Sequence, residues 1–484
     1  MSQFDKMNIS EALDIALDHY TGRRLEDAAH VCWQIVMHEP DCADAWMILG
    51  SIEFRTGNYH ASAALMRRAI DLDQNCAAYH TNWSESLLAI GMVDEARRAA
   101  ECAIKLNPAT AEAYNNLALA LDRRGDLDGA EAAIKLAIQH NPAMAEAYVN
   151  RLSILGKRGE LSFGIEFGKK AMEIAPDVPE IPWNLSLLML KAGRWAEGWP
   201  LYQYRWGCKK FPSPRWRFPE PRWNGAKFDG TLLIHAEQGH GDTMMLSRYM
   251  QLIRPSAKHI VWHVQDDLVE FARLVAPWAE VDKWGTASRF DRHCAMFDLP
   301  WIFNTTPDHV PPPTILELNR IGLLPDGYKI GYCWNGSTQH ANNVNRSATA
   351  DDFAELTKLD AQLVNLTYQK PPIEGTIDPM PMVRDWVTTA HIISELDMVI
   401  TVDTAVAHLA ATLGKPTICM LPSQGVDWRW MDKGESTPWY PSMRLVRKRK
   451  DQSWRECVGG VVASLREAQD EPMAAIENEL AVAV

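Results

Sequence analysis

One short segment in the second half of the chain places acidic, hydroxyl and imidazole side chains where a predicted strand is followed by a predicted helix. Its sequence is Val402-Asp403-Thr404-Ala405-Val406-Ala407-His408. A helix N-terminus presents unpaired N–H groups and about half a positive charge, so it could hold a nucleotide phosphate, with Thr404 as a further donor. Alternatively, Asp403 only caps the helix and His408 is a core histidine. The spacing alone leaves both interpretations open.

Two other polar turns also follow predicted strands. Gly239-His240-Gly241-Asp242 comes after the apolar run 231–237, and Trp334-Asn335-Gly336 ends the run 329–334, with Arg346 shortly beyond it. Ligands of open α/β sheets bind outside the carboxyl ends of the strands. Asn335 is therefore a candidate for the lining of the same pocket. The plain alternatives are that Asp242 is an N-cap and that Arg346 faces solvent.

The elements that would position these turns alternate between strand and helix. Strands are predicted at 231–237, 259–264, 329–334, 363–368, 398–401 and 418–421, and helices at 242–250, 267–275 and 404–413. This alternation is typical of parallel sheets with crossover helices. Two such sets predict two Rossmann-like lobes, at 231–325 and 326–465, as in the two-lobed α/β architecture called GT-B, with a ligand cleft between them. Residues 466–484 are assigned as a tail.

The stretch from 231 to 465 resembles glycosyltransferase family 9, the heptosyltransferases, and the bacterial tetratricopeptide proteins that carry such a domain. The family motif D-T-[GA]-x-[SA]-H is matched by Asp403, Thr404, Ala405, Ala407 and His408, and its G-x-G-D turn by residues 239–242. The resemblance implies that the first motif holds the phosphates and ribose of the donor. It also implies that Asp242 on the first, acceptor-side lobe is the general base, and that Arg346 is the cation of the second, donor-side lobe.

The chemistry that this resemblance implies needs few groups. Inverting sugar transfer requires a base for the acceptor hydroxyl and positive or dipolar support for the departing phosphate. The metal-binding Asp-x-Asp signature occurs only at 71–73 and 126–128, in predicted repeat turns, so we expect a metal-independent enzyme without a cofactor. The segment Asp427-Trp428-Arg429-Trp430 follows the last matched strand and either stacks on a nucleobase or packs in the core.

The first two-fifths of the chain has a different organisation, marked by five glycines spaced 34 residues apart. They are Gly57, Gly91, Gly125, Gly159 and Gly193. This period predicts an all-α tetratricopeptide superhelix over residues 1–206, in units of about 9–42, 43–76, 77–110, 111–144, 145–178 and 179–206. Residues 207–230 carry so many Pro and Trp residues that we expect an extended connector packed on the following lobe.

A second periodic feature of the repeats is an asparagine at the sixth position of four successive first helices. These residues are Asn82, Asn116, Asn150 and Asn184. The position is expected to face the concave groove, where amides can pair with the backbone of an extended peptide. The pattern resembles the asparagine-lined groove of the nucleocytoplasmic O-GlcNAc transferase. Alternatively, each asparagine only bonds the neighbouring helix.

Composition excludes several classes of partner. The net charge of −13 disfavours nucleic acid, and the basic run 444–450 is interpreted as a solvated loop. Nine scattered cysteines indicate reduced thiols. The sequence shows no export signal and no apolar run of membrane-spanning length, so we expect a cytoplasmic protein without a membrane span.

The leading hypothesis combines the two halves of the chain. The repeats would dock a protein acceptor, and the two lobes would transfer a sugar to it from a nucleotide donor. The layout resembles bacterial flagellin glycosyltransferases, which implies flagellin as acceptor and a CMP-linked nonulosonic acid such as pseudaminic acid as donor, with ADP-, UDP- or GDP-sugars possible. The alternatives are a heptosyltransferase-like enzyme acting on a glycan or lipid, and a non-catalytic scaffold.

Overall fold

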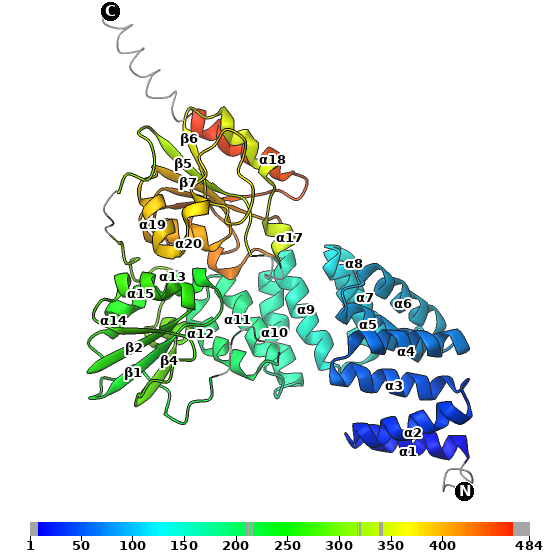
Figure 1. Cartoon of the computed structure of the whole chain (residues 1–484). Coiled ribbons are helices and arrows are strands. Elements are labelled where there is room, and N and C mark those ends of the chain that lie inside the picture. Colours follow the sequence, from blue (N-terminus) through cyan, green and yellow to red (C-terminus); the bar gives the residue numbers. More distant parts are fainter. Residues whose placement is uncertain are drawn as a thin grey trace, which may run out of the picture. The chain divides into compact units, whose positions relative to one another are not determined.

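The computed structural model describes residues 8–209, 211, 213, 216–316, 318, 321–337 and 342–467; most of the predicted tail lies outside these ranges. The chain divides into two compact units, residues 1–184 and 185–484 (Figure 1). The division falls inside helix α11 (Glu180–Lys191). No helix in the described part of the chain is long and apolar enough to cross a membrane.

The first unit is all-helical, which confirms the fold predicted from the glycine spacing. Its helices are α1 (Ile9–Thr21), α2 (Leu25–His38), α3 (Ala43–Thr56), α4 (Tyr59–Leu72), α5 (Ala77–Ala89), α6 (Val93–Leu106), α7 (Ala111–Arg123), α8 (Leu127–His140), α9 (Ala145–Arg158) and α10 (Leu161–Ile174). The periodic glycines adopt left-handed backbone angles, such as φ of +89° at Gly57, which only glycine takes without strain. The periodic alanines Ala69, Ala103, Ala137 and Ala171 are fully buried, so the helices approach closely.

Side-chain hydrogen bonds of constant sequence spacing connect the first helices of consecutive repeats. Each joins residues 35 apart, one more than the repeat length. The bonds include Arg55 Nη1 to the Tyr20 carbonyl (3.0 Å), the Tyr79 hydroxyl to Asp44 Oδ1 (2.5 Å), Asn116 Nδ2 to the Thr81 carbonyl (3.1 Å) and Lys157 Nζ to Asp122 Oδ1 (2.7 Å). Each repeat is thus tied directly to the one before it.

The second unit contains two parallel sheets. The first has the order β3-β2-β1-β4 and the second the order β6-β5-β7-β8-β9. Their strands are β1 (Thr231–His235), β2 (His259–Val264), β3 (Glu280–Lys283), β4 (Arg292–Ala295), β5 (Lys329–Cys333), β6 (Gln362–Asn365), β7 (Met398–Val402), β8 (Thr417–Leu421) and β9 (Met443–Arg447). This arrangement confirms the prediction of two parallel α/β sheets and agrees with an α/β glycosyltransferase domain.

Short helices precede or connect these strands. They are α12 (Trp195–Tyr202), α13 (His240–Leu246), α14 (Met250–Ile253), α15 (Val269–Val275), α16 (Leu299–Ile302), α17 (Asn343–Arg346), α18 (Ala350–Phe353), α19 (Trp386–Ser394) and α20 (Ala405–Thr412). The two that matter for the site are α13, which follows β1, and α20, which follows β7. Figure 1 shows them between the two sheets, and their residues are in contact.

The expectation that the basic run 444–450 is a solvated loop is wrong for its first part, whereas Lys448, Arg449 and Lys450 follow the last strand in a loop. Arg444 and Arg447 do not belong to a solvated loop, because they lie on β9, which pairs with β8 at the edge of the second sheet. Alternate residues of β9 are buried, and Arg444 points out toward Glu435. An edge strand has one neighbour, so charged side chains are tolerated on its outer face.

The residues that precede β1 are anchored to the first sheet by a buried ionic network. Arg205, in the 3-10 helix η2 (Gln203–Gly207), is fully buried and donates from Nε to Glu237 Oε2 (2.9 Å). Its Nη2 reaches Asp298 Oδ1 (2.6 Å) and Glu237 Oε1 (2.8 Å). Further along, Trp223 is buried, and its backbone N–H donates to the carbonyl of His293 on β4 (2.8 Å). The connector therefore packs on the first sheet.

Candidate functional site

The site is built where the turn after β1 meets the helix after β7. Gly241, at the start of α13, lies against His408 of α20 so closely that a Cβ at Gly241 would fall 2.5 Å from His408 Cδ2. Any larger residue would push the two helices apart. The structure thus brings together the two motifs that sequence analysis had placed at the ends of two different strands.

Asp242 has two interactions, one local and one between the two sheets. Its Oδ2 accepts the backbone N–H of Gly239 (2.8 Å). The N-cap residue of α13 is Gly239, so Asp242 stabilises the helix start from the third helical position and not as the N-cap that the alternative interpretation proposed. Its Oδ1 pairs with Nη2 of Arg429 from the second sheet's side. Burial raises the pKa of the Asp242 carboxyl, and the positive charge of Arg429 opposes that rise. A role for Asp242 as general base stays a prediction.

Arg429 is the site residue that sequence analysis did not assign to a role. It lies in the 3-10 helix η8 (Trp428–Trp430) after β8, is 6% exposed, and donates from Nη1 to Asp427 Oδ1 (2.7 Å). Its Nε has no hydrogen-bond partner among the described residues. The sequence signal for this residue is the segment Asp427-Trp428-Arg429-Trp430, where an arginine stands between two tryptophans after a predicted strand.

Asp403 and Thr404 stand at the N-terminus of α20. Thr404 is the N-cap residue, yet its side chain makes no cap bond and instead lies 3.2 Å from the hydroxyl of Thr401. Burial raises the pKa of the Asp403 carboxyl to about 6, while Arg346 opposes the rise. Ala405 is the first residue of the helix. The N–H groups at this helix start, with the hydroxyl of Thr404, form the arrangement expected of a phosphate site.

His408 has contacts of the kind proposed for a core histidine. Its Nδ1 lies 3.0 Å from the hydroxyl of Tyr440, and its ring stacks on Trp430 at a centroid distance of 5.1 Å. Burial is the main cause that lowers its pKa to about 3, so the imidazole is neutral at physiological pH. Any contact with a donor stays a prediction.

Arg346 does not face solvent, which excludes the plain alternative for this residue. It ends α17, is 9% exposed, and its Nε has no partner within the described residues. Its guanidinium lies against Gly336, where an added Cβ would be 2.7 Å from Nη2. Asn335, the neighbour of that glycine, is partly exposed, and its carbonyl accepts a hydrogen bond from the Cys333 thiol (3.4 Å).

The four asparagines of the repeats lie on the first helices of their units. Asn116 donates to the Thr81 carbonyl, Asn184 Nδ2 to the Val149 carbonyl (3.2 Å) and Asn150 Nδ2 to Asn115 Oδ1 (2.8 Å). Three of the four therefore bond the preceding first helix, as the alternative interpretation proposed; Asn82 is partly buried. An amide group has two N–H donors and an oxygen, so one such bond leaves capacity for a peptide.

Two family models match the chain. The tetratricopeptide repeat model matches residues 13–75 and 81–145, and the glycosyltransferase family 9 (heptosyltransferase) model matches residues 387–481. The chain combines tetratricopeptide repeats with a glycosyltransferase family 9 domain. The segment matched by the glycosyltransferase model contains Asp403, His408 and Arg429, whereas Asp242 and Arg346 precede it.

The chain is also similar to individual proteins. Protein FlbA of Caulobacter vibrioides is 23% identical over 336 residues, which cover 60% of this chain and 56% of FlbA. The chain thus spans little more than half the length of this curated relative. Among solved structures, MamA is 22% identical with a TM-score of 0.30, and the match covers 34% of this chain and 90% of the MamA chain. YrrB, a tetratricopeptide protein with an unusual peptide-binding site, is 14% identical with a TM-score of 0.31. The match covers 36% of this chain and 91% of the YrrB chain.

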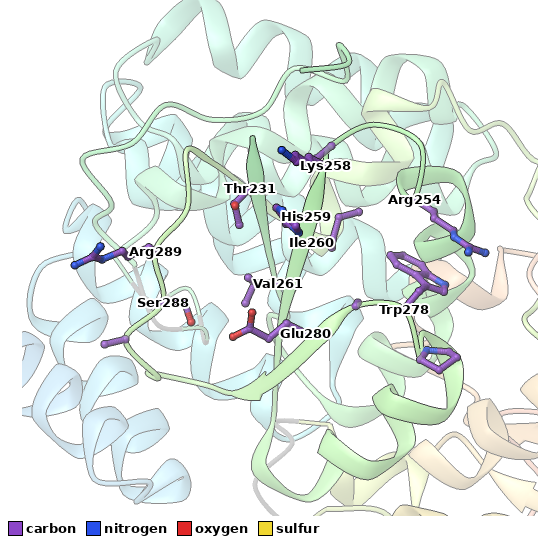
Figure 2. A pocket seen from close by; sticks show the side chains of 14 residues that line it. Thr231, Arg254, Lys258, His259, Ile260, Val261, Trp278, Glu280, Ser288 and Arg289 are labelled. Carbon is purple, nitrogen blue, oxygen red and sulfur yellow. The ribbon is translucent and has the colours of Figure 1, made fainter. Parts of the chain in front are cut away.

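A cavity of about 700 Å³ lies elsewhere in the second unit, at the amino ends of β1, β2 and β3 (Figure 2). Arg254, Lys258 and Arg289 contribute positive charge to its lining, and Arg254 lies 5.5 Å from the ring of Trp278. None of the residues predicted from the sequence lines it. Within the described ranges, no three His, Cys, Asp or Glu side chains are grouped as metal ligands.

Proposed function

We propose that the protein is a nucleotide-sugar-dependent protein glycosyltransferase of the GT-B type, inverting and independent of metal ions. The family 9 domain supports a glycosyltransferase and implies a nucleotide-sugar donor. The observation that carries the finer proposal is the meeting of the turn at Asp242 with the N-terminus of α20. This contact supports the proposal because the Asp242 carboxylate and the helix N-terminus that we propose to bind phosphate belong to two elements in direct contact.

In this proposal the donor lies on the second sheet's side. The N–H groups of α20, the hydroxyl of Thr404 and the guanidinium of Arg346 would hold its phosphates, and Asp403 its ribose. Asn335 would line the pocket. Asp242 would take the proton of the acceptor hydroxyl as that oxygen attacks the sugar carbon, while the nucleotide leaves with the bonding electron pair. Residues 231–325 and 326–465 would form the two lobes.

Tetratricopeptide repeats suggest protein–protein interaction, and we infer that residues 1–206 dock the protein acceptor. Flagellin Ser or Thr side chains are the proposed acceptors, because the layout resembles flagellin glycosyltransferases. The proposed donor is then a CMP-linked nonulosonic acid such as pseudaminic acid. The asparagine series would hold the acceptor backbone with the amide capacity that is not used between repeats.

The donor proposal is tested by thermal shift with CMP, ADP, UDP and GDP. A nucleotide at 100 times its Kd contributes about 2.7 kcal/mol, enough for a shift of a few degrees. We expect CMP to stabilise the protein and the double variant Asp403→Ala, Thr404→Ala to lose the shift. A double variant Thr349→Ala, Asp352→Ala, which removes a capping box from α18, should keep it. A shift from ADP would point to a heptose donor, and no shift from any nucleotide would contradict the proposal.

The acceptor proposal is tested by the binding of purified flagellin to the full chain. We expect Asn82→Ala and Asn150→Ala together to weaken binding, whereas Asn58→Ala, which removes a local bond to Glu53, should not. Circular dichroism of each variant verifies that the helices are intact. Unchanged flagellin binding in the double variant would exclude the asparagine groove.

A further inference from the structure

The buried guanidinium of Arg429 has one N–H group without a hydrogen-bond partner among the described residues. It binds Asp427 through Nη1 and Asp242 through Nη2, and its Nε has no partner among the described residues. At 6% exposure, bulk water cannot satisfy this N–H. A buried donor without a partner is uncommon in native proteins and marks a place for a ligand or an ordered water.

The other buried arginine of the site shows the same feature. Arg346 is 9% exposed and its Nε also lacks a partner in the described part of the chain. Burial raises the pKa of Asp403 and both arginines oppose that rise, so both lie within electrostatic reach of the N-terminus of α20. Two planar guanidinium groups near one helix N-terminus suit a phosphate group, which accepts paired N–H bonds.

The turn that carries Arg429 is held in a strained conformation. Met431, two residues on, has φ of 59° and ψ of 179°, a region that only glycine adopts readily. Arg447 maintains the turn by donating to the carbonyls of Trp430 (2.5 Å) and Gly434 (3.0 Å). Gln238, just before the Asp242 turn, is also left-handed, with φ of 63°. Strain on both sides of the pair indicates that both turns are built to hold particular side chains.

We propose that Arg429 binds the donor's phosphate in place of Asp242, so that donor binding breaks the Asp242–Arg429 pair and releases the carboxylate to act as base. Carboxylate and phosphate compete for the same guanidinium because both are anions with paired acceptor oxygens. Asp427 keeps Arg429 in position during the exchange, and the Gly239 N–H keeps Asp242 at the start of α13. This inference rests on the proposed function, since it requires a nucleotide donor.

The exchange predicts an effect that a purely structural pair would not give. Asp242→Asn removes the competing charge but retains an oxygen for the Gly239 N–H, so nucleotide binding should become about tenfold tighter while sugar transfer is lost. Arg429→Met should weaken binding by about tenfold or more, and Arg429→Lys should restore part of it as a point charge. In the Arg429→Met background, Asp242→Asn should bring no gain.

The measurement is isothermal titration of the full chain with CMP, UDP, GDP and ADP as probes, with the melting temperature of each variant recorded to verify folding. Asp352→Asn, at the equivalent capping position of α18, and the exposed Arg444→Met are the matched controls and should leave affinity unchanged. If the wild-type chain binds a nucleotide and Asp242→Asn leaves its affinity unchanged or lower, the exchange is wrong and the proposed function stands. If the wild-type chain binds none of the four nucleotides, both fail together.

Discussion

At the scale of single residues, burial determines which side chains of the site carry charge. His408 is neutral at physiological pH because burial lowers its pKa to about 3, so it adds no positive charge beside a phosphate. The cations of the site are therefore the guanidinium groups of Arg346 and Arg429. Asp403 is the group whose ionisation lies nearest to neutrality, because burial raises its pKa from 3.8 to about 6.

This shift makes Asp403 a source of pH-dependent stability. The folded state holds the proton more tightly than the unfolded state, so the stabilisation is complete below about pH 4 and is lost as the pH rises through about 6. Ionised Asp403 then costs about 3 kcal/mol of unfolding free energy. We expect Asp403→Asn to be more stable than wild type at pH 7.5, with the difference vanishing toward pH 4, in urea denaturation followed by tryptophan fluorescence. A difference that does not change with pH would contradict this assignment.

At the scale of elements, the contact between α13 and α20 depends on one glycine. Gly241→Ala would place Cβ 2.5 Å from His408 Cδ2, and His408 cannot retreat because Tyr440 and Trp430 hold it. We expect a loss of about 1–3 kcal/mol in unfolding free energy, the usual cost of overpacking. Gly239→Ala is the matched control, since its nearest neighbour would lie at 3.4 Å. Equal stability of the two variants would show that the helices can separate without cost.

The strands with apolar runs could be predicted from the sequence, whereas β3 and β9 could not. The expected span 259–264 coincides with β2, and β1, β5, β7 and β8 lie within two residues of their predicted positions. In contrast, the sequence of β3 is Glu-Val-Asp-Lys and that of β9 is Met-Arg-Leu-Val-Arg, so neither strand has a long apolar run. Both are edge strands, where one side needs no burial.

The same limit applies to the site. Asp403, Thr404 and His408 could be found because they are close in sequence on one strand–helix turn. The pair of Asp242 and Arg429 could not, because 187 residues separate the partners and only the fold brings them together. The partner of Glu237 could not be predicted either, because Arg205, which binds it through Nε and Nη2, belongs to a different element 32 residues earlier.

At the scale of the whole molecule, the chain has two compact units with different internal construction. Residues 1–184 are tied together by bonds between consecutive repeats, and residues 185–484 by two sheets and their helices. A ligand that binds only the second unit stabilises that unit alone. We therefore expect calorimetry to resolve two unfolding transitions, and a bound nucleotide to raise the midpoint of one. Hydrogen exchange should place the added protection within 231–467, and equal shifts of both transitions would contradict this independence.

The constant spacing of the bonds between repeats has a consequence for how such a protein changes over generations. Because each of these bonds joins residues 35 apart, its spacing is the same for different pairs of consecutive repeats. Loss of residues 111–144 would leave Asn150 as far from Thr81 along the chain as Asn116 is now, so a similar bond could form across the junction. Gain or loss of whole repeats can therefore lengthen or shorten the repeat array in steps, while the part of the gene that encodes the two sheets stays unchanged.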